Sequence, residues 1–182
     1  NQVAHRKFSQ TQLCQSDFSL PMVNEIKDSV IIKHAPIGCG TMNMYYHAPD
    51  GKSRYIRTVN TNLTEADVIN GGEEKLVQAI RFAATEFQPQ NIFILSSCVP
   101  TLMGDDLDAV VAQLQKEVSP TLIPVYCAGF KTKISASGYD AVYHALLRYK
   151  IKEPAKARPL TEKGRRTVNL LNTVSVSDTD SK

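Results

Sequence analysis

The chain contains few cysteines, and no two of them are close together in the sequence. There are 4 cysteines in 182 residues, too few for the disulfide framework of a small secreted domain, so a reducing cytoplasmic setting is expected. None of them forms the C-x-x-C pair of a zinc knuckle or of a thioredoxin-like redox site. A ligand that several of these cysteines share must therefore be assembled by the fold from distant segments.

Long apolar runs and an excess of one charge are also absent. Apolar runs such as residues 92–95 fall far short of the roughly 20 residues that span a bilayer, and the chain does not open with the pattern of a signal segment. The 21 Lys and Arg residues nearly balance the 18 Asp and Glu residues. The sequence therefore predicts a soluble protein with no affinity for nucleic acid or membranes.

Short β-rich segments alternate with longer segments of helical period. The predicted strands are residues 29–33, 55–59, 91–97, 122–126 and 167–171. The predicted helices are residues 73–87, 105–118 and 139–149. Strands that alternate with helices are typical of an α/β fold, and the pattern predicts a doubly wound, mostly parallel sheet.

Four parts are expected along the chain. Residues 1–28 are predicted to be an irregular leading arm, residues 29–151 an α/β domain, and residues 152–166 a basic linker. Residues 167–182 are expected to begin a further domain that the chain does not contain, and the first residue is Asn1 rather than Met. We therefore expect a fragment of a longer protein.

Three cysteines stand where the chain is predicted to change direction. Cys39 lies between two glycines in the loop after the first strand, and Cys98 directly follows the third. Ligands of doubly wound sheets bind at the carboxyl ends of the strands, so both cysteines are expected at that edge, over which the arm with Cys14 could fold. Cys127 has an apolar setting and is expected to be a packed thiol. Thiolates assembled in this way favour an iron–sulfur cluster, zinc or copper(I).

Several other polar residues are interpreted as structural. His34 is expected to be a surface or capped histidine rather than a partner of the cysteine loop, and His144 is expected to support the last helix. Asp105 and Asp106 are assigned to the first turn of a helix, where carboxylates satisfy free N–H groups and the helix dipole. A role of this pair in carboxylate catalysis or magnesium binding is the less favoured interpretation.

Four motifs, in order, resemble the nitrogenase component 1 family. Residues 32–40 resemble its HGPxGC turn, and residues 61–76 resemble its acidic segment leading into GGxxKL. Residues 98–107 are similar to its C-x-x-x-x-x-GDD element, and residues 124–130 resemble a stretch typical of its α-type subunits. The resemblance covers residues 10–150, and it identifies the chain as the N-terminal part of an α-type subunit of a nitrogenase or nitrogenase-like reductase.

The resemblance implies a metal centre shared with a second subunit. In the family, cysteines matching Cys14, Cys39 and Cys98 hold one half of an iron–sulfur cluster, of the eight-iron [8Fe-7S] P-cluster type or a [4Fe-4S] cluster, at the interface with a β-type subunit. Gly38 and Gly40 are implied as cofactor-binding residues that allow close approach of the backbone. The other implied partner is an ATP-dependent iron protein, which supplies electrons for an active-site metallocofactor bound mainly by missing domains. The assembly is a heterodimer or a heterotetramer.

Two positions depart from the members that reduce dinitrogen. Tyr139 stands where those members carry a histidine, and His47 stands at about the place of an arginine near the cofactor. Both are candidate catalytic residues. They favour an oxidoreductase that acts on another small substrate, such as a methylthio-alkane, whose C–S bond it cleaves. The fragment alone is expected to be inactive.

Three alternatives stay open. One is a cofactor-assembly scaffold of the same family. Another, from a different class, is a structural zinc module in which Cys127 or His34 supplies a fourth ligand. The third is an inert fragment that carries no cluster.

Overall fold

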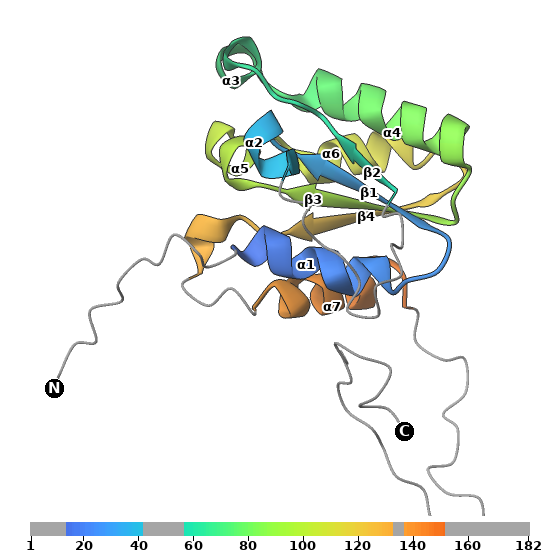
Figure 1. The fold of residues 1–182 in the computed structure, drawn as a ribbon. Helices are drawn as coiled ribbons and strands as arrows, with labels where there is room; N and C mark the ends of the chain where they lie inside the picture. Colours follow the sequence, from blue (N-terminus) through green and yellow to red (C-terminus); the bar gives the residue numbers. More distant parts are fainter. Residues whose placement is uncertain (1–13, 42–56, 133–136, 152–182) are drawn as a thin grey trace, which may run out of the picture.

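The computed structural model describes residues 14–41, 57–132 and 137–151, which are drawn in colour in Figure 1. The strands are β1 (Ser29–His34), β2 (Thr58–Asn60), β3 (Asn91–Ser96) and β4 (Thr121–Tyr126). The helices are α1 (Gln15–Asn24), α2 (Ile37–Thr41), α3 (Glu65–Asn70), α4 (Glu73–Phe87), α5 (Cys98–Met103), α6 (Leu107–Leu114) and α7 (Ser137–Tyr149), with a short 3-10 helix, η2 (Gly129–Lys131), after β4.

The four strands form one parallel sheet in the order β2-β1-β3-β4. The predicted α/β fold with a doubly wound parallel sheet is therefore confirmed. Because β2 lies on one side of β1 and β3 on the other, the direction of winding reverses between β1 and β3. Ligands of such sheets bind beside this switch point, at the carboxyl ends of the strands.

Helices cover both faces of the sheet, α4 and α6 on one and α1 and α7 on the other (Figure 1). Successive side chains of a strand point to opposite faces. Val30 and Ile32 accordingly pack under α4 and α6, whereas Ile31 packs under α1 and α7. Phe93 and Ile94 repeat this division in β3. The middle residues of β1 and β3 are apolar because both faces of the sheet are covered.

Predicted and observed helices agree best where the apolar period is strong. The helix predicted over residues 73–87 is α4, and the one over 139–149 is α7. The helix over 105–118 is shorter, because the Gln115 side chain bonds the backbone of Pro120 and Leu122 and turns the chain toward β4. The strand predicted over residues 55–59 corresponds to β2.

The prediction of an irregular leading arm is wrong for residues 15–24, which form α1. This helix is hard to recognise because Ser16, Asp17 and Ser19 lie on its buried side and Pro21 lies within it. Two of these polar side chains have specific partners: Asp17 pairs with Lys33 of β1, and Ser19 Oγ donates to the carbonyl of Gly138 on α7 at 3.1 Å. A Cβ on Gly138 would overlap the α1 backbone. The two helices therefore pack at close range.

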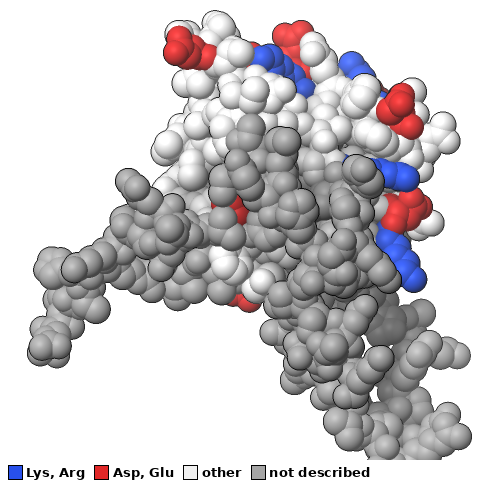
Figure 2. All heavy atoms as spheres, in the orientation of Figure 1, with Lys and Arg blue, Asp and Glu red and all other residues white. Residues whose placement is uncertain are grey.

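Three predicted features lie outside the described residues: the basic linker over 152–166, the strand over 167–171 and the beginning of a further domain over 167–182. Among the described helices, none is both long and apolar enough to cross a membrane. The described surface visible in Figure 2 has acidic and basic side chains close together, without an extended area of one sign.

Candidate metal centre

Three cysteines lie at the beginnings of three helices at one end of the sheet. Cys14 is the N-cap of α1, Cys39 lies in α2 directly after β1, and Cys98 is the first residue of α5 after β3. Figure 1 shows α2, α5 and the start of α1 at the same end of the sheet. The fold therefore places segments that are far apart in the sequence beside the switch point, as predicted for this class of sheet.

Cys14 and Cys98 approach each other around Gly129, the first residue of η2. A Cβ on Gly129 would stand 3.6 Å from Cys98 Sγ and 3.7 Å from Cys14 Sγ. The two sulfurs therefore cannot be farther apart than the sum of these distances. The same Cβ would stand only 3.0 Å from Cys14 Cβ, which is tighter than ordinary carbon contact. A side chain at position 129 would enter the space between the two cysteines.

Cys39 is exposed, and the charges of neighbouring groups affect the pKa of its thiol. Desolvation raises the pKa of its thiol, the positive charge of Lys33 lowers it, and the charges of Cys98 and Asp17 raise it. The described residues contain no group of three His, Cys, Asp or Glu side chains placed to hold a metal ion. Close convergence of all three sulfurs therefore stays a prediction.

Cys127 is fully buried in the core under α1 and α7. Its Sγ lies 3.6 Å from the carbonyl oxygen of Ser96, to which it donates. Burial raises the pKa of its thiol to about 12. A protonated thiol in an apolar core is inert, and the prediction that Cys127 is packed is confirmed.

A buried ion pair lies beside Cys14. Lys33 Nζ and Asp17 Oδ1 are 3.0 Å apart, with side chains 1% and 8% exposed. The other carboxylate oxygen of Asp17 accepts from the backbone N–H and the thiol of Cys14, both at 3.2 Å. Desolvation, followed by the negative charge of Asp17, raises the pKa of Cys14 to about 11. Sequence reasoning missed both members of this pair.

His34 is fully buried at the end of β1, so the expectation of a surface histidine is wrong. Its Nδ1 is 3.1 Å from Thr61 Oγ1, and its Nε2 is 2.9 Å from Asp105 Oδ2. Burial lowers the pKa of the ring, although the bond and the charge of Asp105 oppose this. Asp105 also accepts from the backbone N–H of Gly72 at 3.2 Å. This network joins the ends of β1 and β2 to the loop between α5 and α6.

The two adjacent aspartates have different roles. Asp106 is the N-cap of α6, and its side chain accepts from the N–H of Ala109 at 2.9 Å, as predicted. Asp105 instead turns toward the buried His34 ring, so its assignment to the helix dipole is wrong. A partner 71 residues away cannot be recognised from local spacing.

The predicted glycine and catalytic positions have varied surroundings. A Cβ on Gly40 would overlap the side chain of Asn60, whereas one on Gly38 would meet no atom within 4 Å. The ring of Tyr139 packs edge to face on Phe18 of α1, with centroids 5.8 Å apart. His47 lies outside the described residues.

The chemistry of these residues fits a thiolate-bound group better than an ion bound by oxygen. The candidate donors are three cysteine sulfurs, which are soft ligands. Ser97 Oγ, directly before Cys98, is buried and has no hydrogen-bond partner within the described part of the chain. Lys33 adds a buried positive charge. An anionic iron–sulfur cluster would accept from such donors.

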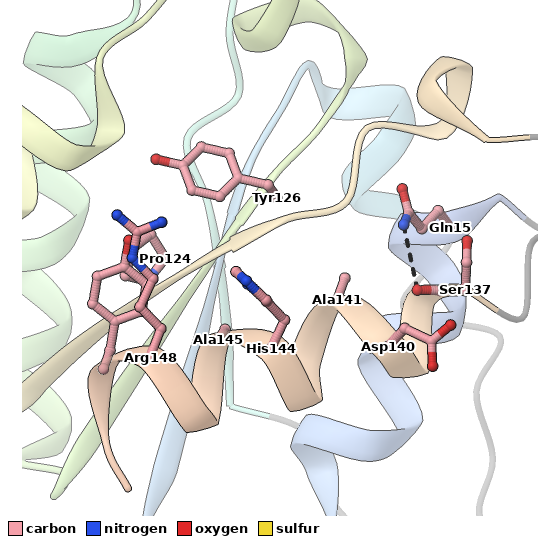
Figure 3. A pocket seen from close by; sticks show the side chains of 10 residues that line it. Gln15, Pro124, Tyr126, Ser137, Asp140, Ala141, His144, Ala145 and Arg148 are labelled. Carbon is pink, nitrogen blue, oxygen red and sulfur yellow. Dashed lines mark hydrogen bonds between the residues drawn. The ribbon is translucent and has the colours of Figure 1, made fainter. Parts of the chain in front are cut away.

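A separate cavity of about 320 Å³ lies between β4 and α7. Figure 3 shows Tyr126 on one side of it and His144 and Arg148 of α7 on the other. Gln15 reaches its edge and donates to the carbonyl of Ser137 at 3.3 Å. None of the four cysteines lines this cavity.

Comparison with known proteins gives consistent matches. The chain matches the family described as nitrogenase component 1 type oxidoreductase over residues 14–181. It is 36% identical, over 138 residues, to the nitrogenase iron-molybdenum cofactor biosynthesis protein NifE of Methanococcus maripaludis strain S2, covering 74% of this chain and 29% of that protein.

Molybdenum-iron protein alpha chains match at a similar level. The chain is 31% identical, over 160 residues, to the nitrogenase molybdenum-iron protein alpha chain of Rhodobacter capsulatus, covering 83% of this chain and 32% of the relative. A solved structure titled "Nitrogenase Cp1 at pH 5" superposes with a TM-score of 0.65 at 28% identity, over 76% of this chain and 30% of that one. The chain thus spans about a third or less of the length of these relatives.

Proposed function

The chain belongs to the nitrogenase component 1 type oxidoreductase family, and we propose that it is the N-terminal part of an α-type subunit that holds half of an interface iron–sulfur cluster. Members of this family generally bind such clusters. The observation that carries the proposal is the approach of Cys14 and Cys98 around Gly129, with Cys39 on the same end of the sheet. A cluster bound there would accept and release single electrons.

The protein residues have distinct tasks in this proposal. Cys14, Cys39 and Cys98 supply thiolate ligands from three different segments. Gly129 leaves room between two of them because it has no side chain. The His34–Asp105 bond holds the end of β1, and hence the turn with Cys39, against the loop that follows α5. The protein thereby fixes the sulfurs before metal binds, which lowers the cost of assembling the site.

A partner surface is proposed around these cysteines. Large apolar side chains are exposed on the three short helices nearby: Ile37 on α2 is 65% exposed, Ile69 on α3 is 82% exposed, and Leu102 on α5 is 73% exposed. Exposed apolar residues that gather at one end of a molecule favour a protein interface. We assign this surface to the β-type subunit that completes the cluster, and to the ATP-dependent iron protein that supplies electrons.

Two functions are compatible with this site. We propose an oxidoreductase whose substrate differs from dinitrogen, such as a methylthio-alkane, because Tyr139 and His47 replace a histidine and an arginine of dinitrogen-reducing members. Cofactor assembly is the second candidate, favoured by the 36% identity to a cofactor biosynthesis protein. Both require the same cluster.

The cluster is tested with cysteine variants of the complete protein, purified with its partner subunit. Cys39→Ala should lose most of the iron and acid-labile sulfide, because it removes a ligand. Cys127→Ala is the matched control and should retain both, because that sulfur is packed in the core. Equal iron contents in the two variants would contradict the assignment.

A further inference from the structure

Lys33 is a buried cation at a position where the pattern of the sheet predicts an apolar residue. It lies on the face of β1 that also carries Ile31, under α1, and it is 1% exposed. Lysine is almost never fully buried unless it is paired. Asp17 is its ion-pair partner, at 3.0 Å.

Stability alone does not account for this pair. Removing two charges from water costs about as much as their attraction returns, so apolar residues of similar size often serve as well or better. The surrounding core of Leu20, Leu95 and Val125 would accept an apolar side chain. The position of the pair, with Asp17 in contact with Cys14, is therefore the feature that needs an explanation.

The two charges of the pair act on the cysteine thiols with opposite sign. The positive charge of Lys33 acts on Cys39 and on Cys127, lowering the pKa of both thiols. The carboxylate of Asp17 lies 3.2 Å from Cys14 Sγ. The charge of Asp17 also raises the pKa of the Cys39 thiol.

We propose that Lys33 and Asp17 are a charge pair that sets the reduction potential of the cluster, with Lys33 favouring the reduced form and Asp17 opposing it. The inference rests on the proposed function. Adding an electron to a cluster makes it more negative, so a nearby buried cation stabilises the reduced state and a nearby anion destabilises it. Electrostatic interactions are strong in such a site because little water screens them. Both residues act as positioning charges and neither is a ligand.

The test uses the complete protein with its partner subunit and follows the cluster by redox titration with electron paramagnetic resonance. Lys33→Met should lower the equilibrium constant for one-electron reduction about tenfold, a shift of about 59 mV to lower potential. Asp17→Asn, which keeps the shape of the side chain, should shift the potential in the opposite direction by a similar amount. The double variant should lie within about twofold of the parent protein, and Lys33→Arg should also stay close to it.

An exposed ion pair provides the control. Arg81 of α4 and Glu117 are 2.8 Å apart and largely exposed, so Arg81→Met should leave the potential unchanged. Opposite shifts for the two buried variants support the proposal, because general damage to the site would move both in one direction. Loss of the cluster in Lys33→Met with retention in Lys33→Arg also supports it.

Two outcomes overturn the proposal and are distinguishable. A parent complex without iron and sulfide overturns the proposed function and this inference together. A cluster whose potential is the same in the parent, Lys33→Met and Asp17→Asn overturns the inference alone.

Discussion

Replacing Gly129 by alanine should damage the metal centre more than the fold. The new Cβ would lie 3.0 Å from Cys14 Cβ and within 3.7 Å of the Cys14 and Cys98 sulfurs. Carbon atoms prefer separations of about 3.5–4.0 Å, so Cys14 or η2 must move by a few tenths of an ångström. Overpacking of this kind costs typically 1–3 kcal/mol. Metal ligands, in contrast, tolerate displacements of only about 0.2 Å.

We therefore expect Gly129→Ala to lose most of the iron while the free energy of unfolding falls by about 1–3 kcal/mol. Gly38→Ala is the matched substitution, because a Cβ there meets no atom within 4 Å. It should change the stability of the metal-free protein by no more than about 1 kcal/mol. Iron analysis and chemical denaturation of the complete protein measure both effects. Full iron content in Gly129→Ala would refute the reasoning that the two sulfurs share a ligand across Gly129.

Three further predictions concern other parts of the molecule. Burial lowers the pKa of His34 in the folded protein, so the unfolded chain binds a proton more readily below its ordinary pKa of about 6.5. The free energy of unfolding should fall as the pH drops from 7 to 5, and His34→Gln should make it depend less on pH. An equal pH dependence of the free energy of unfolding in the parent and in His34→Gln, measured by chemical denaturation, would contradict this. Cys39→Ala should alter the free energy of unfolding by less than about 0.5 kcal/mol because Cys39 is exposed, whereas Cys127→Ala should lower it by about 1 kcal/mol. A larger loss of thermal stability in Cys39→Ala than in Cys127→Ala would be inconsistent with the observed burial. Under the proposed function, the complete protein supplied with an iron protein and ATP should reduce a methylthio-alkane in preference to dinitrogen. Ammonia production at the rate of a conventional nitrogenase would argue against this proposal.

The sheet and the position of two cysteines were predictable because they depend on local patterns. The apolar segments of β1 and β3 predict buried parallel strands, and the switch-point rule then places Cys39 and Cys98 at one edge. The helix α4 has a strong amphipathic period and ends near Pro89, so its bounds agree with the prediction.

The helix α1 was not predictable from its own residues because half of the residues on its buried side are polar. Asp17 is satisfied by Lys33, which belongs to a different element. The His34–Asp105 bond likewise joins the end of β1 to the loop between α5 and α6. Polar side chains can be buried in the core when partners that are distant in the sequence pair with them. Local periodicity does not reveal such partners.

Metal and sulfide analysis of the complete protein, purified without oxygen together with its partner subunit, tests the central claim most directly. The account predicts iron and acid-labile sulfide in comparable amounts, with an electron paramagnetic resonance signal that changes on reduction. The iron and sulfide of this cluster, and its signal, should be largely lost when Cys39 is replaced by alanine. Zinc without acid-labile sulfide, or a complex free of metal, would contradict an iron–sulfur cluster at this end of the sheet.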